Sequence, residues 1–192
     1  MSTNNSYTVL ARHYDELFRP STAGVEFLRE EAAAALRDSG RVTSRVLDVA
    51  CGTGAWLRRV ARSDLEVFGV DISEAMIRQG REIAVKTELD PDRLMVGDMM
   101  AMDDHPCVPF DLVYCIGNSI SHLPTMEEVD RFVAAAARAL GDAGTLVLQY
   151  VTVGALAVGD AFELPDLEAQ GVTLERTYRR SNASEIEFEE SL

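Results

Sequence analysis

Apolar residues along the chain gather in short runs that are separated by stretches of helical periodicity. The short runs are rich in valine, leucine and isoleucine, as in strands that are buried on both faces of a parallel sheet. We expect these strands at residues 45–50, 65–70, 93–97, 111–116 and 145–151. Between them, apolar residues recurring every three or four positions predict helices over 24–38, from about Ala55, over 73–87 and over 126–140. Strands that alternate with helices predict a doubly wound α/β fold.

The two ends of the chain depart from this alternation. Residues 7–20 form a polar and aromatic lead-in, which fits either a lid over a site or an amphipathic segment packed on a sheet edge. Beyond Val151, residues 173–180 and 185–188 alternate in polarity and predict an antiparallel hairpin, whereas 153–170 make a poor helix. We expect a single domain over 1–192 with an N-terminal lid and helix over 1–40, a cofactor-binding core over 45–151 and a hairpin or flap over 152–192.

Composition narrows the class of protein. The chain is 47% hydrophobic and 26% charged, and it has no apolar run long enough to span a bilayer and no signal peptide, so we expect a cytoplasmic protein without a membrane partner. A net charge of −14 argues against a nucleic-acid partner. Cys51, Cys107 and Cys115 lack paired spacing, and we therefore expect no disulfide framework and no metal site.

Candidate binding residues follow the predicted strands, at the point where each strand ends. The first strand runs into Gly52 and Gly54, which allow the backbone to pass close to a ligand at the start of the next helix. Asp71 ends the second strand at the spacing expected for a carboxylate that binds a cofactor ribose. Asp98 and Asn118 follow the third and fourth strands. Since the carboxyl ends of parallel strands meet at one edge, we expect these residues to gather there.

These motifs resemble those of the S-adenosylmethionine-dependent methyltransferases of the Rossmann-like class. The matching segments are 46–54, 69–73 with Met76, 97–99 and 110–113, in this order along the chain. Residues 115–124 are similar to a segment of glycine N-methyltransferases and of small-amine and aminosugar N-methyltransferases. The resemblance implies a three-layer fold, S-adenosyl-L-methionine as the cofactor, and methyl transfer to a small-molecule acceptor, with an amine nitrogen favoured.

The resemblance also implies roles for single residues. Asp71 would accept hydrogen bonds from both ribose hydroxyls, and Ile72 would pack on the adenine. Asp98 and the backbone of Met99 would recognise the adenine amino edge, and Ile116 would line the sulfonium end. The other predicted cofactor contacts are Arg12, Tyr14, Asp48, Ala50, Gly52, Thr53, Gly54, Met76 and Gly117, with Asp48 acting indirectly by orienting the glycine turn.

Methyl transfer requires an acceptor amine with a free lone pair. A base of near-neutral pKa would free this lone pair by removing the proton of the amine. His122 and Tyr14 are the candidate bases, and Asn118 is the candidate residue for orienting the acceptor. His122 fits equally well as a histidine at the pocket edge without a catalytic role.

Two departures from the family pattern limit the prediction. Residues 149–152 lack the arginine that binds the substrate carboxylate in glycine N-methyltransferases, which disfavours glycine as acceptor. The resemblance implies two further sheet strands after the fifth, so either the sheet is abbreviated or the final strands are missing. We expect the second, with an open sheet edge that favours a homodimer. The alternatives are an O-methyltransferase of a small metabolite and a non-catalytic S-adenosylmethionine-binding module. An NAD-dependent dehydrogenase fits the single Gly-x-Gly less well.

Overall fold

The computed structural model describes residues 3–39, 41–152, 155–182 and 185–191. The chain divides into two compact units, which we call the core unit (Arg19–Tyr150) and the appended unit (Met1–Phe18 with Val151–Leu192). Across the described ranges, no helix combines the length and the apolar character that a membrane span requires.

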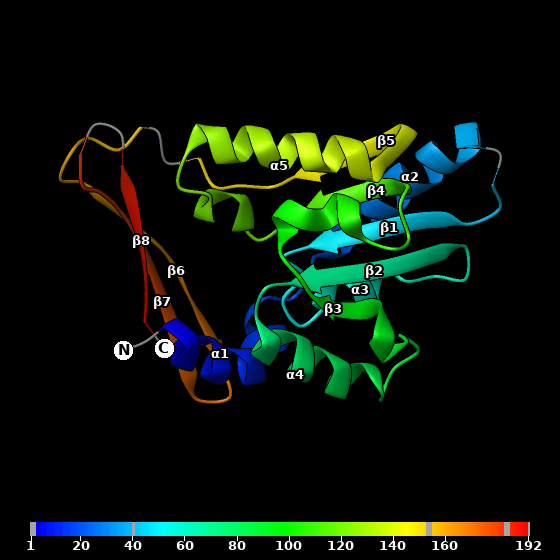
Figure 1. The fold of residues 1–192 in the computed structure, drawn as a ribbon. Helices are drawn as coiled ribbons and strands as arrows, with labels where there is room; N and C mark the ends of the chain where they lie inside the picture. The colour runs from blue at the N-terminus through cyan, green and yellow to red at the C-terminus, as the bar shows by residue number, and fades with distance from the viewer. Residues whose placement is uncertain (1–2, 40, 153–154, 183–184, 192) are drawn as a thin grey trace. The chain divides into compact units, whose positions relative to one another are not determined.

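The core unit is built on a parallel sheet of five strands in the order β3-β2-β1-β4-β5 (Figure 1). The strands are β1 (Ser44–Val49), β2 (Leu65–Asp71), β3 (Leu94–Val96), β4 (Phe110–Cys115) and β5 (Leu140–Leu148). From β1 the chain adds β2 and β3 on one side of the sheet, and it then crosses to the other side of β1 to add β4 and β5. The carboxyl ends of β1 and β4 therefore flank the topological switch point, where ligands bind in folds of this kind. The predicted doubly wound fold is confirmed.

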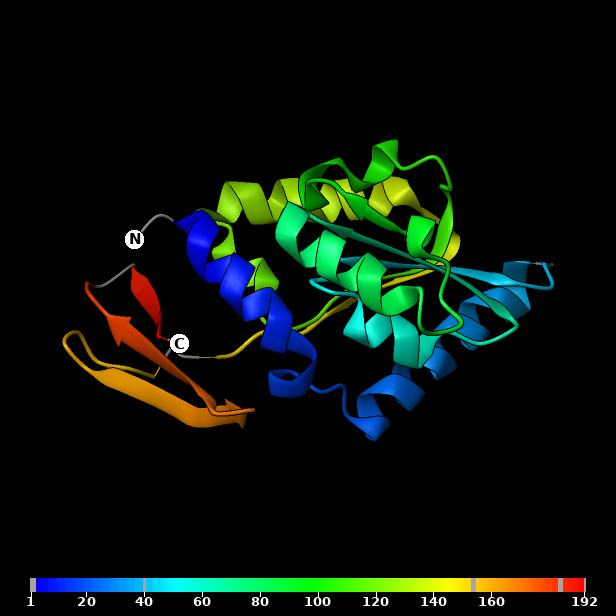
Figure 2. The same ribbon diagram turned by 90° about the horizontal axis from the view of Figure 1, so that it is seen from below.

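Helices cover both faces of this sheet (Figure 2). One face packs against α2, α3 and α4, and the other against α5 and the short helix η2. The helical elements of the core unit are α2 (Thr22–Ser39), α3 (Ala55–Val60), α4 (Glu74–Ala84), η1 (Pro91–Arg93), η2 (Met99–Asp104), η3 (Ser119–His122) and α5 (Met126–Ala139). Because both faces are covered, neighbouring residues of β1 such as Val46 and Leu47 are each fully buried, in opposite layers.

Two predicted helix starts are confirmed by their capping hydrogen bonds. The Ser73 hydroxyl accepts from the Met76 N–H at 3.4 Å before α4, and the Thr125 hydroxyl accepts from the Glu128 N–H at 3.2 Å before α5. Each cap satisfies a backbone donor that a helix start leaves without an internal partner.

The start of β5 differs from the prediction. The sequence predicts a helix to residue 140 and a strand from residue 145, but β5 begins at Leu140 and contains Gly141 and Gly144. Pairing with β4 shifts register between Phe110 and Leu112, so the glycine-containing segment is accommodated as an irregularity. A Cβ atom at Gly144 would lie 2.8 Å from Leu140 Cδ2, which explains why this close fold-back takes a glycine.

The appended unit contains an antiparallel sheet rather than a hairpin alone. Its elements are α1 (Thr3–Leu17), β6 (Ala161–Ala169), β7 (Val172–Arg180) and β8 (Ile186–Ser191), with the strands in the order β6-β7-β8. The predicted hairpin corresponds to β7 and β8, and its expected turn at 181–183 lies partly outside the described residues. The sequence prediction missed β6, where Pro165 falls at a register shift between Leu164 and Leu167. Most of the lead-in forms the helix α1, which packs on β6.

Gly69 offers a test of the packing of β2 against the first crossover helix. A Cβ atom at this position would lie 2.4 Å from Leu57 Cδ1 and 2.9 Å from Cys51 Sγ. We expect Gly69→Ala to lower the free energy of unfolding by about 1–3 kcal/mol, because the added methyl overpacks a closed core. Urea denaturation measures this change. Gly141→Ala is the matched control, since its Cβ would approach no heavy atom closer than 3.7 Å. Equal losses in the two variants would contradict this account.

Candidate functional site

The turn after β1 adopts a backbone that glycine favours. Ala50, Gly52 and Gly54 have φ angles of 58°, 57° and 74°, all in the left-handed region. Gly54 also needs to lack a side chain, because a Cβ there would lie 2.8 Å from Leu94 Cδ2. A backbone that coils in this way presents main-chain N–H groups to a ligand. The sequence motif therefore produces a main-chain cradle at the switch point.

The carboxylate of Asp71 is joined to this turn. Its Oδ2 accepts a hydrogen bond from the Gly52 N–H at 2.7 Å, and its Oδ1 accepts from the Ser73 N–H at 2.8 Å. Burial raises the pKa of Asp71, and the backbone donors of Ser73 and Gly52 oppose that rise. Each carboxylate oxygen retains acceptor capacity beyond its one backbone donor, so two ligand hydroxyls can be accommodated. The predicted meeting of Asp71 with the Gly52 turn is thus present in the structure.

The end of β3 lies beside the end of β2. The Gly97 N–H donates to the Asp71 carbonyl at 3.0 Å, and Asp98 Oδ1 accepts from the Met100 N–H at 2.8 Å to cap η2. Met99 is the first residue of η2 and is half-buried against the core. Asp98 is therefore held at the same edge as Asp71, as expected from the sequence.

Two apolar side chains are exposed at this edge. Ile72 is 74% exposed, and Val96, the register partner of Asp71, is 49% exposed. Exposed aliphatic side chains beside a polar binding group can pack on a flat ring. The sequence prediction included Ile72 but missed Val96. The position of Val96 directly before Gly97 and Asp98 could have indicated that it lies at this edge.

The segment after β4 makes a second cradle. Gly117 and Asn118 have φ angles of 89° and 71°. Gln149, which follows β5, accepts from the Gly117 N–H through its side-chain oxygen at 2.7 Å and donates its own N–H to the Cys115 carbonyl at 3.0 Å. Sequence reasoning noted Gln149 only as the replacement of an expected arginine. The signal that could have identified Gln149 is its position as a polar residue directly after β5, the strand that pairs with β4.

The proposed catalytic segment is a short helix that starts after Asn118. Asn118 Oδ1 accepts from the Ser121 hydroxyl at 2.8 Å, which stabilises η3. His122 ends η3 and is exposed, whereas Ile116, just after β4, is half-buried against the core. Asn118 and His122 are thus carried on one segment at the carboxyl end of β4.

Three further predicted cofactor contacts are Met76, Arg12 and Tyr14. Met76 is only 2% exposed and packs in the core through α4, so its side chain is a core residue. Arg12 and Tyr14 lie on α1 and belong to the appended unit, whereas the glycine turn, including the buried Thr53, belongs to the core unit.

Asp48 is paired in register with Tyr114 below the turn. Asp48 is 3% exposed and Tyr114 is fully buried. Burial raises the pKa of Asp48 well above its usual value, the Tyr114 hydroxyl opposes this rise, and the charge of Asp71 adds to it. Among the described residues, Asp48 Oδ2 and the Tyr114 hydroxyl have no partner of normal hydrogen-bond geometry. The Gly52 N–H of the turn above Asp48 donates to Asp71.

The buried carboxyl of Asp48 leads to a pH prediction. Because its pKa is raised in the folded state, the folded protein binds more protons than the unfolded chain between the usual and the raised pKa. The free energy of unfolding therefore falls as pH rises above the usual aspartate value of about 4. We expect Asp48→Asn to flatten this slope in urea denaturation series from pH 4 upward. Asp142→Asn, at an exposed position, is the control, and a wild-type slope in Asp48→Asn would contradict the assignment.

Most of the core unit matches a known protein family. A family model described as a methyltransferase domain matches residues 46–144, more than half of the chain. The matched range begins in β1 and ends within β5.

Curated relatives and solved structures extend this similarity. The chain is 33% identical over 104 residues to dTDP-4-amino-2,3,4,6-tetradeoxy-D-glucose N,N-dimethyltransferase of Saccharopolyspora spinosa, covering 54% of this chain and 39% of that protein. It is 32% identical over 171 residues to dTDP-3-amino-3,6-dideoxy-alpha-D-glucopyranose N,N-dimethyltransferase of Streptomyces fradiae, covering 84% and 62%. The S-adenosylmethionine-bound amino pentose methyltransferase CalS10 of Micromonospora echinaspora matches with a TM-score of 0.68 and 25% identity, covering 95% of this chain and 79% of that one.

Proposed function

Because the chain belongs to the methyltransferase domain family, we propose that it transfers a methyl group from S-adenosyl-L-methionine to an amine of a small-molecule acceptor. The predicted membership in the Rossmann-like class of these enzymes is confirmed by the family match together with the fold. The acceptor class and the site residues are the further parts of the proposal.

The cofactor part of the proposal rests on the edge formed by β1, β2 and β3. When bound, S-adenosylmethionine supplies an activated methyl group on a positively charged sulfur. Asp71, fixed by the Gly52 and Ser73 N–H groups, would hold the two ribose hydroxyls. The exposed Ile72 would pack on the adenine, and Asp98 would bind the adenine amino edge.

The proposed acceptor rests on how much of the chain is similar to amino sugar methyltransferases. The match to the Streptomyces fradiae amino sugar N,N-dimethyltransferase runs over 171 residues, well beyond the 46–144 range that the methyltransferase domain model matches. The match to the amino pentose methyltransferase covers 95% of the chain and so includes strands of the appended unit. This shared extension favours an amino sugar as the acceptor and nitrogen as the methylated atom.

Within the proposed reaction, the chain positions the acceptor and removes a proton. The attacking amine needs a free lone pair, and an imidazole can accept its proton near neutral pH. We assign this role to His122, with Tyr14 as the second candidate. Asn118 would orient the acceptor from the same segment as His122, while Gln149 keeps the backbone of Gly117 in place.

Asp71→Asn tests the cofactor site. In Asp71→Asn, the NH2 group of the amide would face a backbone N–H, and one acceptor for the ribose hydroxyls would be lost. We expect the Kd for S-adenosylmethionine to rise about 10- to 100-fold, which is the usual effect of losing a hydrogen bond to a charged group. Isothermal titration measures this change, and Asp104→Asn at an exposed position is the control. An unchanged Kd in folded Asp71→Asn, or binding of NAD in place of S-adenosylmethionine, would refute the assignment.

His122→Ala tests the base. With dTDP-linked amino sugars as acceptors, we expect kcat to fall about 100- to 10,000-fold with an unchanged Kd for S-adenosylmethionine, because general base catalysis contributes that much. Initial rates over a pH series measure the effect. An unaltered rate and pH profile would remove His122 from the mechanism. If the wild-type chain binds the cofactor but methylates no acceptor in an amine panel, it is a binding module and not an enzyme.

A further inference from the structure

Gln149 joins the carboxyl ends of β4 and β5 through two hydrogen bonds. Its N–H donates to the Cys115 carbonyl at 3.0 Å, one residue beyond the last register pair of the two strands, Cys115 with Leu148. Its side-chain oxygen Oε1 accepts from the Gly117 N–H at 2.7 Å. Gln149 therefore holds the chain on both sides of Ile116, directly where it leaves β4.

The turn that follows β4 is held by this hydrogen bond and not by packing. Gly117 and Asn118 both lie in the left-handed region, with φ angles of 89° and 71°, and this backbone is uncommon for a residue with a side chain such as Asn118. Among the described residues beyond its chain neighbours, no heavy atom lies within 4 Å of a Cβ built on Gly117. A strained backbone persists only where its surroundings fix it, and the bond from Gly117 to Gln149 supplies that constraint.

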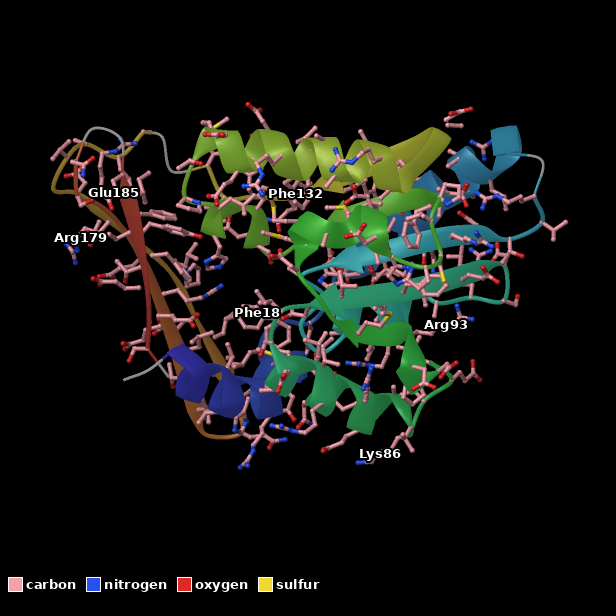
Figure 3. All side chains as sticks on the ribbon, viewed as in Figure 1. Phe18, Lys86, Arg93, Phe132, Arg179 and Glu185 are labelled. Carbon is pink, nitrogen blue, oxygen red and sulfur yellow. The ribbon has the colours of Figure 1, made fainter. Side chains whose placement is uncertain are left out.

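The same turn decides how the chain enters the short helix η3. Asn118 is the N-cap of η3, but its side chain makes no capping hydrogen bond to the described backbone of that helix. Farther along, Ile120 is buried in the same layer as Phe132, which lies on the side of α5 that faces the sheet (Figure 3). The segment is thus fixed at Gly117 and at Ile120. These two points set the positions of Asn118, before η3, and of His122, its last residue.

We propose that Gln149 is a positioning residue for methyl transfer, which acts through the Gly117 N–H to hold residues 117–122 in the arrangement that the reaction needs. This inference rests on the proposed function, because it requires that Asn118 and His122 contact the acceptor. A displacement of about 1 Å in such a segment costs on the order of 100-fold in rate. The alternative is that Gln149 only closes the end of the β4–β5 pairing, which would affect stability and not the reaction.

Two substitutions in the full chain separate the side-chain oxygen of Gln149 from the rest of the residue. Gln149→Met removes the acceptor at nearly unchanged length, whereas Gln149→Glu retains an oxygen that can accept from the Gly117 N–H. With dTDP-linked amino sugars as acceptors, we expect kcat to fall about 10- to 100-fold in Gln149→Met and to stay near the wild-type value in Gln149→Glu. The Kd for S-adenosylmethionine should be unchanged in both variants, which also shows that they are folded. Gln79→Met is the matched control, because it makes the same change on α4, which packs against β2 and β3.

Amide hydrogen exchange gives a second readout that needs no acceptor. We expect the Gly117 amide to exchange about tenfold faster in Gln149→Met and at the wild-type rate in Gln149→Glu, because only the first variant loses the hydrogen bond. Wild-type kcat in folded Gln149→Met would overturn the proposal, whether or not the Gly117 amide exchanges faster. An equal loss of kcat in Gln149→Glu or in Gln79→Met would overturn it as well.

The two readouts keep this result separate from the proposed function. If Gln149→Met does not fold, Gln149→Asn retains the amide but is one methylene too short to reach Gly117, and its kcat must fall for the proposal to stand. A wild-type chain that methylates no amine, but whose Gly117 amide exchange depends on Gln149, would refute the proposed function and leave the hydrogen-bonded turn supported.

Discussion

The hydrogen bonds of the Asp71 carboxylate are the constraint on which the rest of the core unit depends. Parallel strands cannot be joined by tight turns, so their carboxyl ends leave backbone donors that need partners. Asp71 provides acceptors for two of them, on Gly52 after β1 and on Ser73 before α4, and its carbonyl accepts from Gly97 after β3. One half-buried residue thereby joins three connections, two through its carboxylate and one through its main-chain carbonyl. The same backbone donors oppose part of the desolvation that raises the pKa of Asp71.

The core unit was predictable because the physical signals for it are local. A strand buried on both faces is a continuous apolar run, and β1, β2 and β4 are each such runs. The meeting of Asp71 with the Gly52 turn follows from a topological rule, since right-handed crossovers bring the ends of neighbouring parallel strands together. Neither inference requires knowledge of side-chain packing.

The features that sequence reasoning missed depend on pairings between distant segments. Gln149 reads as an ordinary polar residue until β5 pairs with β4 and places its side chain at Gly117. The contact between Asp48 and Tyr114 exists only through the register of β1 and β4. Strand β6 escaped detection because Pro165 interrupts its alternation, and the bulge that accommodates this proline becomes visible only with β7 in place.

The binding of a cofactor and the selection of an acceptor can depend on different parts of the chain. The matched methyltransferase domain ends at residue 144, so Asp71 and the Gly52 turn belong to a part that methyltransferases with different acceptors can share. The amino sugar acceptor that we propose would then be selected by residues outside that range. The net charge of −14 matters here, because an acidic chain repels a diphosphate at long range. Salt screens that repulsion beyond about 8–10 Å, so an anionic acceptor would be selected by short-range contacts and not by the overall field.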